Sequence, residues 1–327
     1  MKISVVTPTY NRAKELDNLY KSLVENLKHN IPFEWVVMDD GSSDNTKELI
    51  DEYINENKIE IKYYYQENQG KMQALNNVMN YAEGDLIIEC DSDDYFTDDA
   101  FEIIKKKHEL MRMNENVCAM IFPRKMINHK VNHISKDEYI TTIFELFFKE
   151  GLEGDTTIVF NSEIRKKFKH KLERGEKFVT EARMYHQMDL EYNFIYFNEN
   201  ICISEYLEDG YSKNIYDTFK KCPYGYLEYF KELINLNMQG VKIKKRLYII
   251  KHYILFSYMT KQKGTLKNVK NIGNKILTTI LLWPGYLKSY IKTKWEVWSM
   301  NVWATNGNPR SEKNALVNNE EWIVDSE

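Results

Sequence analysis

The chain has 327 residues, 43% hydrophobic and 29% charged, so it can bury a large core and is not a disordered protein. Its formal net charge of −4 hides a division along the sequence. Residues 216–300 carry 16 Lys and Arg against 4 Asp and Glu, a net charge of +12. Residues 301–327 carry −3, which leaves −13 for residues 1–215. The sequence therefore describes an acidic body with a basic appendage.

The cysteines and the hydropathy pattern predict a cytoplasmic protein. Four cysteines are scattered without the spacing of a metal site or a disulfide framework: Cys90, Cys118, Cys202 and Cys222. The first eight residues are typical of a β-strand and not of a signal peptide. No apolar run approaches the roughly 20 residues that cross a bilayer.

The first hundred residues alternate strand and helix signals, joined by short connections. Strands are predicted at residues 3–7, 34–38, 59–65 and 86–90. Helices are predicted at residues 12–28, 47–53, 71–81 and 100–111. Further strands are predicted near residues 117–122, 157–160 and 194–196, and the sequence becomes helical and basic from residue 216. Repeated βα units of this size predict an α/β fold with a doubly wound, mostly parallel sheet and a C-terminal helical appendage.

Polar residues and glycines follow each of the first four predicted strands. The segments concerned are residues 7–12, 39–44, 68–71 and 91–94. Ligands of doubly wound sheets bind beyond the carboxyl ends of the strands. We therefore expect one site, built from these four segments at one edge of the sheet.

The acidic segment Asp91-Ser92-Asp93-Asp94 directly follows a predicted buried strand. In an extended segment, Asp91 and Asp93 would lie on the same side and could converge on a hard cation. Such a cation can neutralise the charge on a departing diphosphate. Helix capping and a phosphatase-type aspartate nucleophile are alternatives, whereas an EF-hand loop is excluded because Phe96 occupies its glycine position.

Two other segments suit a nucleotide. A carboxylate of Asp39-Asp40, at the end of the second strand, could accept a hydrogen bond from a base or a ribose hydroxyl. Gly70-Lys71 opens the third helix, where backbone N–H groups and a positive charge suit an anion. This segment is not a P-loop, because the Gly-x-x-x-x-Gly-Lys-Ser/Thr pattern is absent.

Together these segments resemble the family 2 glycosyltransferases, which have the GT-A fold. The matching residues are Ser4–Arg12, Met38–Asp44, Asn68–Lys71 with Ala74 and Asn76, and Asp91–Asp94, the last being a DxD motif. The resemblance covers residues 1 to about 110 and extends more loosely to about 215. It implies an inverting enzyme that uses a UDP-sugar and Mn²⁺ or Mg²⁺. The Gln-x-x-Arg-Trp signature of processive synthases is absent from the sequence. The resemblance therefore implies transfer of single hexosyl or N-acetylhexosaminyl units.

The resemblance also assigns roles to the residues that match its motifs. It places Pro8, Thr9 and Tyr10 in the nucleotide pocket and Asp40 on the uracil. It places Gly70 and Lys71 near the nucleotide or its phosphates, and Asp91 on the ribose side. Asp93, with Asp91, would hold the metal, and Asp94 would support the donor sugar or its loop.

An inverting transfer needs a base opposite the leaving diphosphate. The family supplies a carboxylate, often from a Glu-Asp pair, and the matching position here is Glu181, followed by Ala182 instead of an acid. Glu176 and Asp155 are the reserve candidates. Glu181 could also simply begin a helix. His186 is expected to be structural, and Tyr206 with residues 209–212 is expected to cover the diphosphate.

The basic appendage combines apolar residues, aromatic residues and lysines. Ile243, Leu247, Ile250, Ile254 and Tyr258 recur at helical spacing among basic side chains. Farther on, aromatic residues and lysines interleave up to Trp298, as in helices that lie in a bilayer interface. We expect residues 243–298 to bind an anionic membrane surface, at the inner face of the cell membrane. Packing on the body or a homo-oligomer is the alternative, and no motif indicates nucleic acid.

These observations divide the chain into a catalytic domain (1–215), a basic helical region (216–300) and a polar, flexible tail (301–327). The catalytic domain has a nucleotide-sugar half (1–110) and an acceptor half (111–215). The expected activity is transfer of one sugar to a hydroxyl of a lipid-linked or cell-surface glycan precursor. A catalytically inactive UDP-sugar-binding or membrane scaffold protein is the alternative. A sugar-1-phosphate nucleotidyltransferase is disfavoured, because residues 8–12 lack its Gly-rich, Arg-containing loop.

Overall fold

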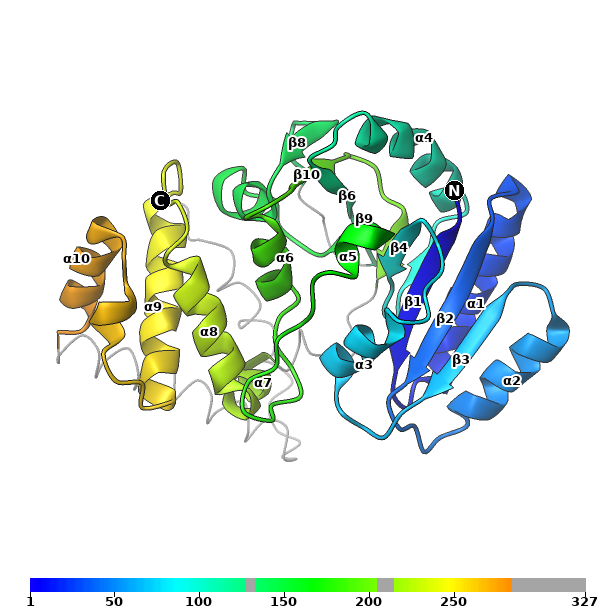
Figure 1. The fold of residues 1–327 in the computed structure, drawn as a ribbon, viewed down its shortest axis with the longest axis horizontal. Coiled ribbons are helices and arrows are strands. Elements are labelled where there is room, and N and C mark those ends of the chain that lie inside the picture. The colour runs from blue at the N-terminus through cyan, green and yellow to red at the C-terminus, as the bar shows by residue number, and fades with distance from the viewer. Residues whose placement is uncertain (128–132, 205–214, 284–327) are drawn as a thin grey trace, which may run out of the picture.

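The computed structural model describes residues 1–127, 133–204 and 215–283, which form an α/β body and a helical unit beside it (Figure 1). The body holds the described residues up to 204, and the helical unit begins at residue 215. Tyr206, residues 209–212, the end of the basic region and the whole predicted tail lie outside the described residues.

The body is built on one eight-stranded sheet in the order β3-β2-β1-β4-β9-β6-β10-β8. Its strands are β1 (Ile3–Thr9), β2 (Phe33–Asp39), β3 (Ile61–Tyr65), β4 (Leu86–Glu89), β6 (Val117–Pro123), β8 (Tyr139–Thr141), β9 (Thr156–Asn161) and β10 (Asn193–Tyr196). Strands β1 to β4 pair in parallel, as do β6 and β10, whereas β9 and β8 pair antiparallel to their neighbours. The prediction of a mostly parallel, doubly wound sheet is therefore confirmed.

Helices cover both faces of this sheet, which is why the central strands are almost continuously apolar. On one face, α1 (Ala13–Asn26), α2 (Thr46–Glu56) and α4 (Ala100–Arg112) contribute to the largest apolar cluster. On the other face lie α3 (Lys71–Val78) and α6 (Ala182–Met188). Alternation along β1 shows the division, since Val5 belongs to the first cluster and Val6 packs with the residues of α3.

A small second sheet joins parts of the chain that are far apart in sequence. Its strands are β5 (Tyr95–Phe96), β7 (Lys125–Met126) and β11 (Cys202–Ser204), in the order β5-β11-β7. β5 directly follows Asp94 and β7 directly follows Arg124. This sheet therefore brings the acidic segment close to an arginine thirty residues later in the chain. Strands of two or three residues have no periodicity, so the sequence pattern did not predict them.

The helical unit packs against the body through α3 and through the segments around Phe144 and Phe178. It consists of α7 (Ile215–Lys221), α8 (Pro223–Leu233), α9 (Ile243–Met259), a 3₁₀ turn (Thr265–Asn268) and α10 (Ile272–Leu281). Its apolar core includes Met72 and Leu75 from α3. Ile250 and Ile254 of α9 are buried in this core, whereas Ile243 and Tyr258 are exposed. The apolar stripe predicted along α9 is therefore mainly a packing surface.

None of the helices within the described ranges combines the length and the hydropathy that a membrane-crossing segment needs. All four cysteines are free and buried.

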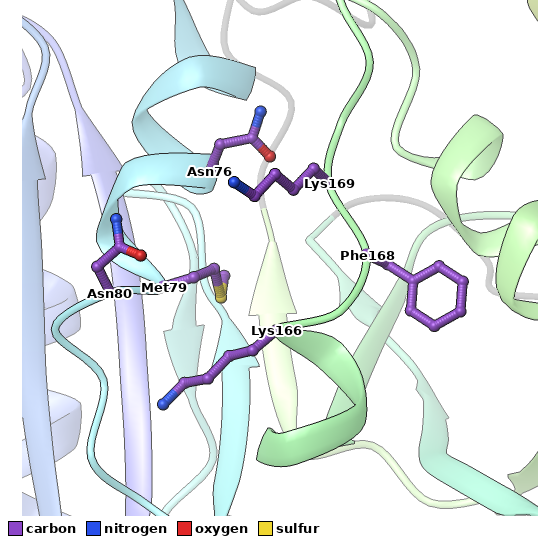
Figure 2. A pocket seen from close by; sticks show the side chains of 6 residues that line it. All are labelled: Asn76, Met79, Asn80, Lys166, Phe168 and Lys169. Carbon is purple, nitrogen blue, oxygen red and sulfur yellow. The ribbon is translucent and has the colours of Figure 1, made fainter.

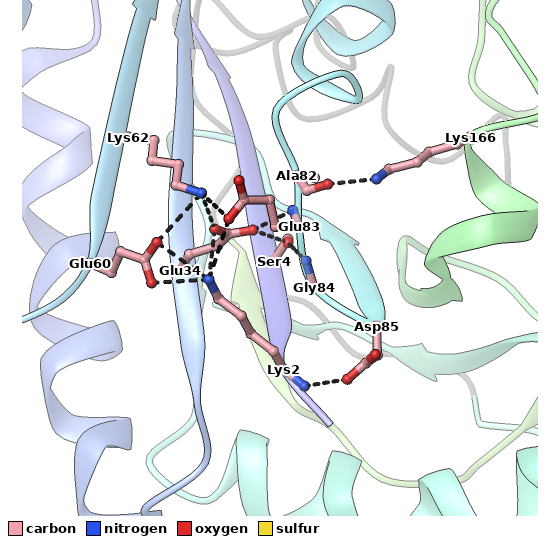
Figure 3. Close-up of polar contacts among 10 residues, drawn as sticks. All are labelled: Lys2, Ser4, Glu34, Glu60, Lys62, Ala82, Glu83, Gly84, Asp85 and Lys166. Atoms are coloured by element: carbon pink, nitrogen blue, oxygen red, sulfur yellow. Dashed lines mark hydrogen bonds and ion pairs between the residues drawn. The ribbon is translucent and has the colours of Figure 1, made fainter.

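A buried carboxylate holds the amino-terminal edge of the sheet together (Figure 3). Glu34, at the start of β2, is fully buried and accepts hydrogen bonds from the Ser4 hydroxyl and the Glu83 N–H. The ammonium groups of Lys2 and Lys62 lie 3.0 and 2.8 Å from its Oε2. The cluster thus joins β1, β2, β3 and the turn before β4, at the edge opposite the loops described next.

Candidate active site

Strand register places the loops after β1 to β4 at one rim, as the sequence predicted. Thr9 pairs with Asp39 and Asp39 pairs with Tyr65, so the first three strands end at the same level. The Cys90 N–H, just after β4, donates to the Val6 carbonyl at 3.0 Å. All the segments expected to bind the donor therefore emerge together.

The residues expected to line the nucleotide pocket lie at the end of β1. Pro8 and Thr9 are buried, and the following Tyr10 is 49% exposed. The Thr9 hydroxyl is buried without a hydrogen-bond partner within the described part of the chain. Of these three residues, Tyr10 offers the accessible surface for an approaching ligand.

Hydrogen bonds tie the loop after β1 to the loop after β2. Asn11 has a φ of +53° and its side-chain oxygen accepts from the Ser43 N–H at 2.8 Å. The Ser42 hydroxyl accepts from the Asn11 N–H at 2.9 Å. Asp44 accepts from the Ala13 N–H at 3.2 Å, at the start of α1. The two loops therefore form one rigid wall of the site.

Asp40 fastens the loop after β3 to the end of β2. Its buried carboxylate accepts hydrogen bonds from the Gln66 side chain at 2.7 Å and from the N–H groups of Gln69 and Gly70 at 2.8 Å. An ionised carboxylate has about four acceptor positions. The predicted bond to a base therefore has roughly one position left, and Asp40 has a positioning role that the sequence did not reveal.

Gly70 is packed against the segment that precedes Glu181. Its φ is +94°, and a Cβ atom there would lie 2.2 Å from the Lys177 carbonyl oxygen. The Lys177 ammonium group donates to the backbone and side-chain oxygens of Asn68 at 2.9 and 2.8 Å. Only glycine fits this backbone and this close approach. The loop after β3 is therefore in direct contact with the segment that precedes the candidate base.

Lys71 is the central cation of the site. Its Nζ lies 2.9 Å from the Asp91 carboxylate and 2.9 Å from Oε1 of Glu181. Burial alone would lower the pKa of Lys71, but the attraction of the two carboxylates outweighs it and raises the pKa well above its usual value. Burial likewise opposes the charge of Asp91, yet Lys71 and Arg124 lower its net pKa. Lys71 is therefore a permanent positive charge between two carboxylates.

The acidic segment after β4 forms a turn, not the extended segment expected from the sequence. The Asp94 N–H donates to the Asp91 carbonyl at 3.1 Å, and Ser92 and Asp93 lie in the turn between them. One carboxylate oxygen of each aspartate lies within 4.8 Å of those of the other two. The side chains converge because the backbone turns, whereas the expectation relied on the alternation of a strand.

This carboxylate set suits a hard divalent cation. Asp91 already faces Lys71 and Asp94 faces Arg124, whereas the described residues include no ion-pair partner of Asp93. Burial and the negative charge of Asp91 raise the pKa of Asp93, and the positive charges of Lys71 and Arg12 offset this rise only in part. The donor set is therefore compatible with Mg²⁺ or Mn²⁺, and Asp93 is the aspartate of the three that no described ion pair engages.

Arg124 is a site residue that the sequence analysis missed. It forms a buried ion pair with Asp94, which is 4% exposed. Burial raises the pKa of Asp94, Arg124 counteracts this rise, and Asp91 and Asp93 add to it. Arg124 follows the predicted strand at residues 117–122, so the strand-end rule used for the first four strands would have found it.

The three candidate bases lie in different surroundings. Glu181 is the N-cap residue of α6, and its side chain is 28% exposed beside Lys71. Glu176 accepts hydrogen bonds from the N–H groups of Tyr224 and Gly225 at 2.8 and 2.7 Å, so it caps α8. Asp155 is exposed, and its backbone carbonyl accepts from the Arg124 N–H. Within the described part of the chain, Glu181 alone of the three is joined by an ion pair to a residue expected to bind the donor.

A buried polar network lies beneath these residues and was also missed. Arg165 is fully buried and donates to Glu89, the last residue of β4. Nη2 of Arg165 also lies 3.3 Å from Nε2 of His170. Burial, Arg165 and Lys71 hold the pKa of His170 well below its usual value, so its imidazole is neutral. A charged residue at the end of an otherwise apolar strand was the available signal for Glu89.

His186 is a structural residue. It is 5% exposed, its Nδ1 lies 3.0 Å from Asp189, and its ring stacks on Tyr229. The same Asp189 accepts the N–H groups of Ile143 and Phe144. His186 thus supports the Asp189 carboxylate, which binds two backbone N–H groups and takes no part in the acidic turn.

A pocket of about 280 Å³ lies between α3 and the segment after α5 (Ser162–Arg165), as Figure 2 shows. Its lining residues are Asn76, Met79, Asn80, Lys166, Phe168 and Lys169. None of the residues expected to bind the donor or the metal lines it. It is therefore separate from the cluster around Lys71.

The sheet order, the rim and the carboxylate cluster define a GT-A glycosyltransferase fold, and solved structures agree. The chain superposes on Staphylococcus aureus TarS 1–349 in complex with UDP-GlcNAc with a TM-score of 0.50, 18% identity and coverage of 89% of this chain and 81% of that one. It superposes on the mannosyltransferase PcManGT of Pyrobaculum calidifontis, in complex with GDP-Man and Mn²⁺, with a TM-score of 0.53, 14% identity and coverage of 92% and 87%.

Residues 4–170 match the profile of glycosyl transferase family 2, so the chain belongs to that family. Among curated relatives, an uncharacterized glycosyltransferase of Mycoplasma genitalium is 33% identical over 125 residues, covering 37% of this chain and 41% of the relative. The poly(ribitol-phosphate) beta-N-acetylglucosaminyltransferase TarS of S. aureus is 32% identical over 174 residues, covering 50% and 30%. The chain therefore matches less than half of the length of these relatives.

Proposed function

We propose that this family 2 glycosyltransferase transfers a single sugar from a UDP-sugar to an acceptor hydroxyl, with inversion and with Glu181 as the base. One observation carries the proposal. The Lys71 ammonium group lies 2.9 Å from both Asp91 and Glu181, so a donor-side acid and a candidate base share one cation. A reaction in which a base acts across from a leaving diphosphate needs these groups together.

In the proposed reaction, Glu181 accepts the proton of the acceptor hydroxyl as its oxygen attacks the anomeric carbon. The bond from that carbon to the diphosphate breaks, and its electron pair leaves with UDP. Lys71 pairs with Glu181 and adds positive charge beside the acidic turn. Asp93 and Asp91 would hold Mn²⁺ or Mg²⁺, which would neutralise charge on the diphosphate. Arg124 holds Asp94 in the turn, so that the neighbouring carboxylates stay in place.

The nature of the donor and acceptor rests on the relatives. A solved TarS structure contains UDP-GlcNAc, and this supports a UDP-activated hexosyl or N-acetylhexosaminyl donor. TarS is named for a poly(ribitol-phosphate) acceptor, and another relative is named an undecaprenyl-phosphate 4-deoxy-4-formamido-L-arabinose transferase. Both names support a cell-surface or lipid-linked glycan precursor as the acceptor class.

The test is a panel of UDP-sugars incubated with the full chain and Mn²⁺, with released UDP as the readout. We expect one or a few donors to be hydrolysed slowly without acceptor, and Asp93→Asn to remove this activity while the fold is kept. Full activity of Asp93→Asn would contradict the metal role. Binding of UDP without turnover of any donor would favour a non-catalytic UDP-sugar-binding protein.

A further inference from the structure

The last described helix, α10, packs Leu277 and Leu281 against the core of the helical unit but turns a second apolar stripe outward. It lies at the end of the molecule farthest from the α/β body (Figure 1). Ile272, Ile276 and Ile280 are 76%, 57% and 60% exposed, and Trp283, just beyond the helix, is 73% exposed. The spacing of these residues puts them along one side of a helix. Exposed isoleucines on successive turns differ from the isolated apolar residues that any protein surface carries.

The opposite side of α10 is fixed inward by polar contacts. Asn274 and Thr278 are fully buried. The Asn274 amide donates to the Ile234 carbonyl at 2.6 Å, and its oxygen accepts from Arg246. Turning the isoleucines inward would break these buried hydrogen bonds, at a cost that their burial makes high. The outward direction of the apolar stripe is therefore set by the fold.

The surroundings of the stripe are strongly basic. Residues 241–283 contain ten Lys and Arg and not one Asp or Glu. Lys270 and Lys275 are exposed next to the isoleucines. A pocket of about 330 Å³ near the start of α10 is lined by Lys231, Lys267 and Lys270, together with Glu232, Asn235 and Asn268. The only acid in that lining, Glu232, is paired with Arg183.

We propose that the side of α10 formed by Ile272, Ile276, Ile280 and Trp283 docks on an anionic lipid bilayer surface. Apolar residues and a tryptophan on one side, with lysines beside them, are the composition of helices that lie in the bilayer interface. From Ile272 to Trp283 the helix rises only about 17 Å, too short to cross the hydrocarbon core, so it would lie along the surface. The lysines gain from the negative potential of anionic headgroups.

Charge also argues against a second copy of the chain as the partner. A symmetric dimer through this stripe would place two identical basic regions against each other, because both subunits use the same surface. Neither copy offers an acid from residues 241–283 to offset the repulsion. An anionic bilayer satisfies the apolar stripe and the basic region together.

The experiment uses the full chain and two kinds of vesicle, phosphatidylcholine alone and phosphatidylcholine with phosphatidylglycerol, in a co-sedimentation assay. We expect binding to the anionic vesicles that weakens as salt is added. Ile276→Gln with Ile280→Gln should weaken this binding about tenfold or more, because two apolar side chains no longer leave water. Gln keeps good helix propensity, so α10 should persist. Leu190→Gln, at a 71% exposed leucine of the body, is the matched control and should bind as the unaltered chain does.

A second double variant measures the electrostatic contribution to vesicle binding. Lys270→Gln with Lys275→Gln should reduce the salt dependence of binding, while the contribution of the apolar side chains remains. The proposal is overturned if the unaltered chain does not bind anionic vesicles, or if the double Ile→Gln variant binds equally well. It is also overturned if light scattering shows a dimer that this variant dissociates. A lower unfolding midpoint of the double Ile→Gln variant would mean that the chain itself covers the stripe, and would overturn the proposal too.

Discussion

The ammonium group of Lys71 lies 2.9 Å from Oε1 of Glu181, although 110 residues separate them in the sequence. Lys71 is the first residue of α3 and Glu181 is the N-cap residue of α6. The same ammonium group also lies 2.9 Å from Asp91. Two helices on one face of the sheet thus converge on the acidic turn, and the lysine connects the two halves of the body.

Replacing this lysine tests whether the connection is functional. Lys71→Met removes the only charge recorded between Asp91 and Glu181 in the described structure, so the two carboxylates would repel each other and the diphosphate would lose a neighbouring cation. We expect kcat for sugar transfer to fall about 100-fold, as for other preorganised electrostatic groups. Steady-state kinetics with the active UDP-sugar measures this change. Lys71→Arg, which keeps the charge, should retain more activity, and an unchanged kcat in Lys71→Met would contradict the proposed role.

Three glutamine or asparagine variants distinguish the candidate bases. Glu181→Gln should lower kcat by about 10² to 10⁴, the usual contribution of a general base, while UDP binding measured by calorimetry is kept. Glu176→Gln should keep turnover but lower the free energy of unfolding by about 1–3 kcal/mol, because a charged partner of two backbone N–H groups at the start of α8 is lost. Asp155→Asn should change neither quantity. Turnover that survives in Glu181→Gln and vanishes in Glu176→Gln would move the base.

Asp40→Asn separates a structural role of this residue from a role in base binding. The amide cannot accept from all three donors that the carboxylate serves, so the loop after β3 should loosen. We expect the free energy of unfolding, measured without nucleotide, to fall by about 1–3 kcal/mol. UDP affinity should fall as well, since this loop carries Lys71. If unfolding is unchanged and only UDP affinity falls, then Asp40 serves the nucleotide alone.

The sequence predicted the first half of the body well for a physical reason. Local periodicity marks β1 to β4 and their helices, and parallel strands joined by short loops must present their carboxyl ends at one rim. The placement of Asp40, Lys71 and Asp91 at that rim follows from these rules. The sequence also predicted that the acidic side chains converge, but it did so from the alternation of an extended strand. The turn between Asp91 and Asp94 has no distinct sequence pattern, so the turn itself was not predicted.

Contacts between distant segments could not be predicted in this way. The pairing of Asp94 with Arg124 depends on strands of two or three residues, and the capping of α8 by Glu176 joins residues 48 and 49 positions apart. Composition and periodicity describe one segment at a time. The end of a strand can mark Arg124 as a residue of the rim, but no local signal names its partner or the partners of Glu176. For α10 the sequence offered two directions, a bilayer surface or packing on the body, and periodicity did not decide between them. The buried Asn274 fixes the opposite side of the helix inward, so Ile276 and Ile280 face outward.

A glycine pair tests the close approach between the loop after β3 and the segment before Glu181. Gly70 and Gly154 have nearly the same φ, +94° and +91°, but a Cβ at Gly70 would lie 2.2 Å from the Lys177 carbonyl and a Cβ at Gly154 meets nothing within 4 Å. Gly154→Ala should therefore cost only the backbone strain, about 1–2 kcal/mol of unfolding free energy. Gly70→Ala should cost about 3 kcal/mol or more and weaken UDP binding. Equal losses in denaturant titrations of the two variants would show that the contact with Lys177 is unimportant.

The buried Glu34 at the opposite edge of the sheet predicts a loss of stability in acid. Burial alone would raise the pKa of Glu34, but Lys62, Ser4, the Glu83 N–H and Lys2 lower it from 4.5 to about 2. Between these pH values the unfolded chain binds the proton that the folded chain excludes, so the free energy of unfolding rises with pH. The contribution is fully present above about pH 5 and is lost as the pH falls towards 2. Its size is on the order of 3 kcal/mol, measured by denaturant titration at a series of pH values.

Two variants isolate this contribution from the other acids that titrate in the same range. Glu34→Gln should be less stable at neutral pH, since Lys2 and Lys62 lose their buried partner. Below about pH 4.5 its unfolding free energy should also depend less steeply on pH, because up to one proton fewer is taken up on unfolding. Glu60→Gln is the matched control. Its carboxylate faces the same two lysines but is 47% exposed, so water screens the pair and the change should stay near or below about 1 kcal/mol. A Glu34→Gln variant with the same acid slope as the unaltered chain would mean that Glu34 is not the group that titrates.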